Sequence, residues 1–164
     1  MIEPELIFLK EPLLTFGFSQ KTSDPRDGLT LYGPFHREKI DGQLNIGIIG
    51  PAKQRTYLRE YLQNLHKPIF NPNPDVARPF FPGLKSTFGV HINFKNINEI
   101  DVPENEINKY LFYEDSHQRV HNLTNLYSDR LSKYNKQEES PVVMWFVAIP
   151  DEIYKFGRPK SKIP

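Results

Sequence analysis

The longest unbroken apolar run of the chain extends from Val142 to Ile149, between Pro141 and Pro150. Apolar and polar residues do not alternate along it, so a strand formed here has to bury both of its faces. Strands of this kind occur in parallel sheets that helices cover on both sides. The run is far shorter than the ~20 apolar residues that cross a bilayer. The sequence therefore predicts an α/β fold with Val142–Ile149 as a central strand.

A strand, a tight turn and a helix follow one another earlier in the chain. Leu44–Ile49 predicts a short aliphatic strand that ends at Gly50-Pro51, where proline suits the first turn of a helix. Apolar residues then recur at i, i+3, i+4 and i+7, the spacing of an amphipathic helix. They are Leu58, Tyr61, Leu62 and Leu65. This order is typical of the opening of a βα unit.

The later segments complete the pattern. Val90–Phe94 alternates strictly and predicts a second strand, Pro103–Phe112 predicts a short helix, and Ser116 can cap a longer one that runs to Tyr134. Strands alternating with helices predict a Rossmann-like parallel sheet flanked by helices over residues 44–164. Ligands in such sheets bind beyond the carboxyl ends of the strands. Those ends are Gly50-Pro51, the loop after Phe94, and Pro150 onward.

Residues 1–43 are expected to form an N-terminal extended arm. Leu6–Leu9 and Leu13–Phe16 are apolar and β-prone. Asp24–Gly28 predicts a turn, because proline fixes φ and glycine tolerates a positive φ. Leu29–Tyr32 then alternates, and no helical period is visible in this arm.

Charge and cysteine content exclude several classes of protein. The 164 residues include 21 Lys and Arg against 20 Asp and Glu, a net charge of +1, which excludes a globally basic nucleic-acid binder but not a local basic patch. Because cysteine is absent, disulfide frameworks, zinc ribbons, thiol catalysis and iron–sulfur sites are excluded. The N-terminus lacks the basic and apolar segments of a signal peptide. We therefore expect a cytoplasmic protein with no membrane partner.

Catalytic and cofactor patterns are weak. Gly47–Gly50 lies at a strand–helix turn but lacks the spacing of a dinucleotide fingerprint, which favours a packing role. His117 and His121 have a spacing that can share a metal, but a solvated or partner-facing pair is favoured. Asp24 and Asp27 suit the caps of a proline turn, and no nucleophile elbow is present. We expect no catalytic residue, no metal site, no cofactor and no enzyme activity.

A basic cluster follows the last predicted strand. Tyr154, Lys155, Arg158 and Lys160 lie in a stretch where residues 155–162 hold four positive groups and no acid. A tyrosine with nearby Lys and Arg beyond a buried parallel strand suits a terminal phosphate and a stacked base. The alternative is a solvated tail, and the residues alone leave both interpretations open.

Taken in order, several segments resemble the MID region of short prokaryotic Argonaute proteins, over about residues 4–160. The matching segments are Asp24–Leu29, Tyr32–Phe35, Ile46–Gly50, Phe80–Leu84 before Phe88, and Ile149–Tyr154. The resemblance implies a Rossmann-like MID domain that anchors the 5′ end of a small RNA or DNA guide, as part of prokaryotic defence. It also implies that Tyr154 and a basic partner, Arg158 or Lys155, contact the 5′ phosphate.

The family pattern continues with a helix carrying Gln and a second Lys and then with a PIWI half, and this chain stops at Pro164 before either. No catalytic carboxylate is therefore carried over, and we expect the N-terminal portion of a longer or split protein. Two functions follow from the resemblance. One is a non-catalytic guide-binding module that forms part of the 5′-phosphate pocket. The other is a protein-interaction fragment that docks a PIWI half or a companion effector without binding nucleic acid itself.

Overall fold

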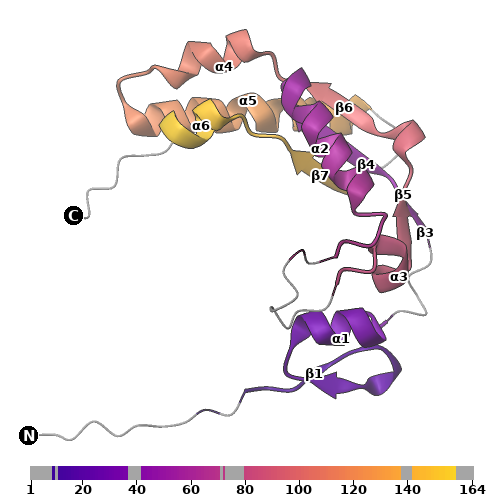
Figure 1. Cartoon of the computed structure of the whole chain (residues 1–164). Coiled ribbons are helices and arrows are strands. Elements are labelled where there is room, and N and C mark those ends of the chain that lie inside the picture. The colour runs from indigo at the N-terminus through magenta and orange to yellow at the C-terminus, as the bar shows by residue number, and fades with distance from the viewer. Residues whose placement is uncertain are drawn as a thin grey trace, which may run out of the picture. The chain divides into compact units, whose positions relative to one another are not determined.

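The computed structural model describes residue 9 and residues 11–36, 42–70, 72, 80–137 and 142–157. The chain divides into two compact units (Figure 1). The first unit comprises the described residues up to Gly42 together with Leu65–His91, and the second comprises Gln43–Asn64 and the described residues from Ile92 onward. The predicted division into an arm of residues 1–43 and a domain of residues 44–164 groups the chain differently and stays a prediction.

A three-stranded parallel sheet forms the centre of the second unit. Its strands are β6 (Asn98–Asp101), β4 (Ile46–Gly50) and β7 (Met144–Val147), in that order across the sheet. In the register of the sheet, Ile48 of β4 lies opposite Glu99 on one side and Phe146 on the other. All five residues of β4 are buried, so β4 is the central strand.

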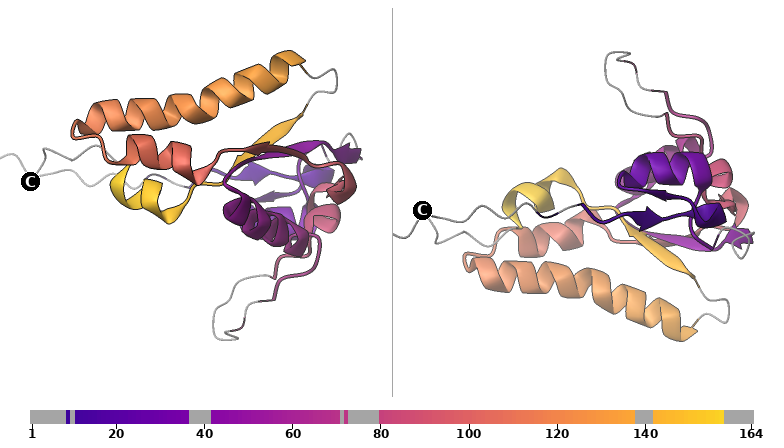
Figure 2. Two further views of the ribbon diagram at one scale, coloured as in Figure 1. Left: turned by 90° about the horizontal axis from the view of Figure 1, so that it is seen from above. Right: turned by 90° about the horizontal axis from the view of Figure 1, so that it is seen from below.

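Helices cover both faces of this sheet. Figure 2 shows α2 (Ala52–Asn64) on one face, and α4 (Glu104–Leu111) and α5 (Ser116–Gln137) on the opposite face. The short helix α6 (Asp151–Phe156) follows β7. The buried residues between the sheet and the helix pair α4–α5 form one apolar core, which lowers the free energy of the folded unit by removing apolar surface from water. They are Ile49, Val102, Ile107, Leu111, Leu123, Leu126 and Tyr127.

The first unit has small elements. The antiparallel strands β1 (Leu14–Thr15) and β2 (Lys21–Thr22) flank a 3₁₀ turn at Gly17–Ser19. The helices are α1 (Pro25–Tyr32) and α3 (Leu84–Phe88). The strands β3 (Gly42–Leu44) and β5 (Val90–Ile92) lie where the chain passes from one unit to the other. A 3₁₀ turn at Phe94–Asn96 belongs to the second unit and precedes β6.

The predicted fold class is confirmed as mixed α/β with a parallel sheet flanked by helices, an arrangement compatible with a Rossmann-like fold. The predicted central position of Val142–Ile149 is wrong. The part of this run that forms a strand is β7, which pairs within the sheet only with β4. Among the described residues one edge of β7 has no neighbouring strand, and Val143 and Ile149, which flank β7, are more than half exposed.

The predicted strand at Val90–Phe94 is confirmed over Val90–Ile92, which form β5, but β5 pairs with β3 and is not part of the three-stranded sheet. The strand that pairs with β4 is β6, whose sequence Asn-Glu-Ile-Asp lacks an apolar run. Two of its side chains, Glu99 and Asp101, are instead held by arginines of α2. Ion pairs therefore replace the apolar contacts from which a strand is usually recognised.

Two local predictions change at helix starts. Leu29–Tyr32 is helical rather than extended, because Asp24 accepts hydrogen bonds from the backbone N–H of Arg26 (2.7 Å) and Asp27 (3.1 Å) and so caps α1. In α5 the cap is Asp115 rather than Ser116. Asp115 accepts hydrogen bonds from the backbone N–H groups of Gln118 and His117. These bonds stabilise the ionised carboxylate and so lower the pKa of Asp115 below its usual value.

We predict that Gly47→Ala destabilises the second unit. A Cβ atom at Gly47 would lie 2.3 Å from the ring of Trp145 on the neighbouring strand, so the ring or the strand has to shift. Overpacking of this kind costs roughly 1–3 kcal/mol. Gly42→Ala is the matched control, because a Cβ there has no atom within 4 Å. Chemical denaturation compares the two, and equal stabilities of both variants would contradict the packing of Trp145 on Gly47.

Candidate functional site

The two neighbours of β4 in the three-stranded sheet come from later parts of the chain. The next strand of this sheet along the chain, β6, lies on one side of β4, and the last one, β7, lies on the other. The β4–α2 and β7–α6 connections therefore diverge beyond the carboxyl ends of two adjacent parallel strands. Such a topological switch point is where open α/β sheets place their ligands.

A cleft of about 540 Å³ lies at this switch point. One wall comes from the first half of α2 and the other from the β7–α6 connection. The lining residues are Lys53, Gln54, Tyr57 and Leu58, and Val147 to Glu152. A second pocket of about 300 Å³ shares Lys53, Gln54, Pro150 and Glu152 with it and adds Glu104 and Asn108. The size of the cleft falls in the range of ~300–1,000 Å³ typical of small-ligand sites.

The floor of the cleft depends on a close approach between Gly50 and Ala148. Gly50 has φ +148°, and a Cβ atom there would lie 2.4 Å from the carbonyl oxygen of Ala148, so a side chain has no room. The backbone N–H of Ala148 donates to the carbonyl oxygen of Ile49 at 2.8 Å. The hydroxyl of Tyr127 donates to the Ala148 carbonyl oxygen at 3.3 Å. Residues from β4, β7 and α5 thus fix the start of the β7–α6 connection.

The α2 wall presents polar groups to the cleft. Lys53 and Gln54 belong to the first turn of this helix, where unpaired backbone N–H groups favour negative charge and no acidic side chain is present. The Oε1 atom of Gln54 is buried and accepts no hydrogen bond from the described residues. The ammonium group of Lys53 lies 6.0 Å from the centroid of the Tyr57 ring. A donor, an aromatic face and an unsatisfied acceptor therefore face the same space.

The other wall is acidic. Asp151 and Glu152 begin α6 and line the cleft opposite Lys53. The described lining thus combines one ammonium group with two carboxylates, and it is not a uniformly positive surface. The carboxylates of this wall accept hydrogen bonds from amino groups, whereas the ammonium group of the α2 wall donates to anions such as phosphate.

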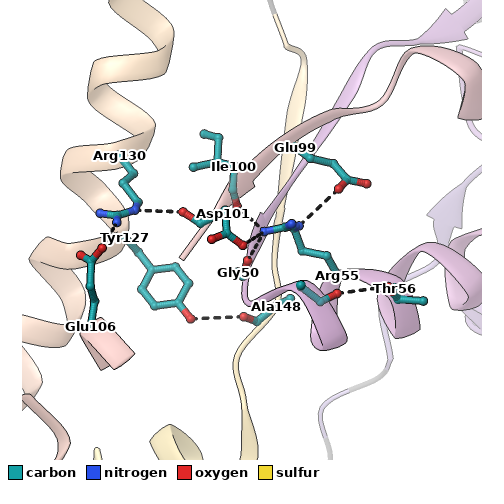
Figure 3. A network of polar contacts seen from close by, with 11 residues as sticks. Gly50, Arg55, Thr56, Glu99, Ile100, Asp101, Glu106, Tyr127, Arg130 and Ala148 are labelled. Atoms are coloured by element: carbon teal, nitrogen blue, oxygen red, sulfur yellow. Dashed lines mark hydrogen bonds and ion pairs between the residues drawn. The ribbon is translucent and has the colours of Figure 1, made fainter. Parts of the chain in front are cut away.

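An arginine network holds α2 against the sheet (Figure 3). Nη1 of Arg55 donates to the carbonyl oxygens of Gly50 (2.6 Å) and Ile100 (3.3 Å) and to Asp101, and its Nε donates to Glu99 (3.3 Å). The Arg55 side chain is only 14% exposed. It therefore ties the end of β4, the end of β6 and the first half of α2 together directly behind the cleft.

Two further arginines extend this network. Arg59 also pairs with Glu99 and donates to the Phe94 carbonyl oxygen at 3.1 Å. Arg130 of α5 donates to the Asp101 carbonyl oxygen at 3.0 Å and to Glu106 of α4 at 2.8 Å. The hydrogen bonds of these arginines thus link α2, through the edge strand β6, to α4 and α5.

Two of the four predicted binding residues are described. Tyr154 and Lys155 lie on α6 one turn after Asp151, and both side chains are exposed, that of Tyr154 by 65%. They follow the acidic wall on the same helix, and neither is among the residues that line the cleft. Arg158 and Lys160 lie outside the described residues.

The predicted histidine pair has a local partner. His121 is within hydrogen-bond distance of the Asn125 side chain, at 3.0 Å between Nε2 and Nδ2. Across the described part of the chain, no three His, Asp or Glu side chains are grouped as a metal centre requires. His117 and His121 are exposed on α5.

Sequence reasoning located this edge of the sheet but missed the α2 wall. Lys53, Gln54 and Tyr57 follow Gly50-Pro51, which the pattern had marked as a strand end where ligands bind. They were missed because polar residues in the first turn of an amphipathic helix are normally exposed to solvent and suggest no binding role. Their position after a glycine that closes a parallel strand is the signal that could have identified them.

The chain matches no protein-family model, and no curated protein shows significant similarity to it. Among the described helices, none is both long and apolar enough to cross a bilayer.

We predict that Arg55→Lys destabilises the second unit by roughly 1–3 kcal/mol, because lysine cannot reproduce the forked donation to two carbonyl oxygens and two carboxylates. Urea denaturation measures the effect. The matched control is Arg26→Lys, since the Arg26 side chain is exposed, and its stability should change by less than about 0.5 kcal/mol. A similar small change for both variants would contradict a clamp at Arg55.

We predict an alkaline loss of stability that depends on Tyr127. Burial raises the pKa of Tyr127 to about 12, above the ~10 of an exposed tyrosine. A raised folded-state pKa means that the stabilisation is fully present below pH ~10 and is lost as the pH rises through about 12.

Denaturation midpoints measured across that pH window test this dependence. The wild type should lose stability relative to Tyr127→Phe as the pH rises, whereas Tyr61→Phe, a change at an exposed tyrosine, serves as the control. A wild-type advantage over Tyr127→Phe that stays constant with pH would show that the phenol is not protected from ionisation.

Proposed function

We propose that this chain is the MID-like, guide-binding module of an Argonaute-type protein of prokaryotic defence, and that it binds the 5′ end of a small RNA or DNA strand at the switch-point cleft. The observation that carries the proposal is the position of the cleft. It lies directly before α6, the helix that carries Tyr154 and Lys155. A ligand-sized space at the carboxyl end of the parallel strands supports the proposal, because α/β sheets bind their ligands there.

In this proposal the terminal phosphate lies between the first turn of α2 and α6. Lys53 and Lys155 supply charge-assisted hydrogen bonds, and the free N–H groups at the start of α2 add a favourable dipole. Tyr154, exposed on α6, provides a face on which the terminal base stacks. Arg158 and Lys160 follow α6 in sequence and are further positive residues that we assign to the same binding function.

The acidic wall gives the site a second role. Asp151 and Glu152 repel a phosphate but accept hydrogen bonds from the amino groups of a base. The carboxylates therefore orient a nucleotide, because they accept hydrogen bonds from its base edge while Lys53 and Lys155 hold its phosphate. Binding and orientation need no cofactor and no catalytic step, and the proposed module is not an enzyme.

A second candidate function, docking of a PIWI half or a companion effector, is favoured by a separate surface. An apolar groove of about 300 Å³ lies between α5, β7 and α6. Its apolar lining includes Val120, Leu131, Val147, Ile149 and Ile153. The groove borders β7, which is an edge strand of the sheet as described, and such a combination is typical of surfaces that another polypeptide covers.

Direct binding measurements test the proposed guide-binding function. We expect a 5′-phosphorylated single strand to bind more tightly than the same strand with a 5′ hydroxyl. Lys155→Ala and Lys53→Ala should each weaken binding of the phosphorylated strand roughly tenfold or more, because each removes a charge-assisted contact. The 5′-hydroxyl strand should lose much less.

Lys133→Ala is the matched control, because Lys133 is an exposed lysine of α5 away from the cleft. Equal weakening by all three variants would indicate general attraction to the backbone, which falls steeply with salt. Binding without any preference for the 5′ phosphate would contradict the proposed site. The absence of binding to either strand would favour the docking function.

A further inference from the structure

Two short segments of the first unit pair in antiparallel fashion before α3. The backbone N–H of Ile69 donates to the Phe81 carbonyl oxygen at 2.8 Å, and the N–H of Phe81 donates to the Ile69 carbonyl oxygen at 2.9 Å. Side chains alternate across such a pair, so the residues next to Ile69 and Phe81 lie on the opposite face. Phe70 and Phe80 are these neighbours.

Phe70 and Phe80 form a stacked pair on that face. Their ring centroids are 5.3 Å apart with an interplanar angle of 20°. Phe70 is 71% exposed and Phe80 is 44% exposed, although a cross-strand aromatic pair gains most when its faces are covered. The first unit therefore presents a flat aromatic surface to solvent.

The surroundings of this pair are positively charged. Lys67 precedes it and Lys85 follows it in α3, and both side chains are exposed. A backbone hydrogen bond of 2.9 Å from the Leu84 N–H to the Leu65 carbonyl oxygen holds the two lysine-bearing segments side by side. Within the described part of residues 65–91 there is no Asp or Glu. Over residues 65–91 as a whole the sequence has Lys67, Arg78 and Lys85 against Asp75, an excess of positive charge in a chain whose net charge is only +1.

We propose that the Phe70–Phe80 pair is a stacking surface for the bases of a single-stranded nucleic acid, with Lys67 and Lys85 attracting its backbone. Exposed aromatic faces combined with positive side chains are the usual means of binding single strands without sequence preference. Charge complementarity favours this polyanionic occupant over an apolar peptide, since no described carboxylate of the segment opposes it.

This surface is independent of the proposed 5′-end site. It belongs to the first unit, whereas the switch-point cleft and α6 belong to the second. It also recognises a different part of the strand, because stacking on phenylalanine involves internal bases and needs no terminal phosphate. The two proposals can therefore fail separately.

Fluorescence polarisation with a labelled single strand that carries a 5′ hydroxyl tests the stacking surface in the full chain. Phe70→Leu keeps an apolar side chain but removes the aromatic face, and it should weaken binding by roughly 5- to 100-fold. Phe70→Tyr keeps the face and should bind like the wild type. Phe112→Leu is the matched control, because Phe112 is an exposed phenylalanine of the second unit.

A strand without bases separates stacking from backbone attraction. The wild type should bind the abasic strand more weakly than the normal one, and Phe70→Leu should weaken binding of the abasic strand no further. Thermal melting establishes that Phe70→Leu is folded, and Phe80→Leu provides a second test of the same surface.

The proposal is overturned if Phe70→Leu and Phe80→Leu both bind the normal strand like the wild type, or if Phe70→Leu weakens the normal and abasic strands equally. Failure of the wild type to bind any 5′-hydroxyl strand would also overturn it. A preference for 5′ phosphate that persists in Phe70→Leu would show that the cleft functions without it.

Discussion

The approach of β4 to β7 is the contact on which the second unit depends. Gly47 leaves room for the Trp145 ring, and Gly50 lets the backbone pass the Ala148 carbonyl oxygen where any side chain would collide. Because both glycines lie on the fully buried central strand, they set the spacing of the sheet and the direction in which the chain leaves it. The β7–α6 connection then begins at a fixed point, and the cleft opens between that connection and α2.

Three arginines of the second unit form hydrogen bonds and ion pairs within that unit. Arg55, Arg59 and Arg130 are paired with carboxylates and carbonyl oxygens of the sheet and of α4. Lysines are exposed at the candidate site, with Lys53 at the cleft and Lys155 on α6. This division suits a ligand-binding module, since forked guanidinium groups fix the fold while flexible ammonium groups remain available to a phosphate. Two such lysines also flank the Phe70–Phe80 pair in the first unit.

Periodicity predicted the elements that bury apolar stripes. Leu44–Ile49 and the helical spacing after it correspond to β4 and α2, and α4 and α5 also lie close to their predicted positions. β6 was missed because its carboxylates are stabilised by arginines from another element, which no local pattern reveals. The helix α1 was read as a turn because Asp-Pro suits both a turn and a helix start.

The site was predictable in position but not in composition. The rule that ligands bind beyond parallel strands indicated the edge of the sheet at which the cleft lies, and Tyr154 and Lys155, whose role stays a prediction, lie on the helix that begins at the cleft. The contribution of α2 depends on which strands are neighbours, and the Phe70–Phe80 pair depends on cross-strand register. Strand order and register involve residues distant in sequence, so a single sequence does not specify them directly.

Photocrosslinking from the 5′-terminal nucleotide tests the central claim most directly. A 5′-phosphorylated strand with a photoreactive first base is bound to the full chain and irradiated, and the crosslinked peptide is identified by mass spectrometry. The account predicts crosslinks to the cleft walls, at Lys53 to Leu58 or at Val147 to Tyr154. Crosslinks confined to the first unit, or spread evenly over exposed residues of both units, would contradict a 5′-end site at the switch point.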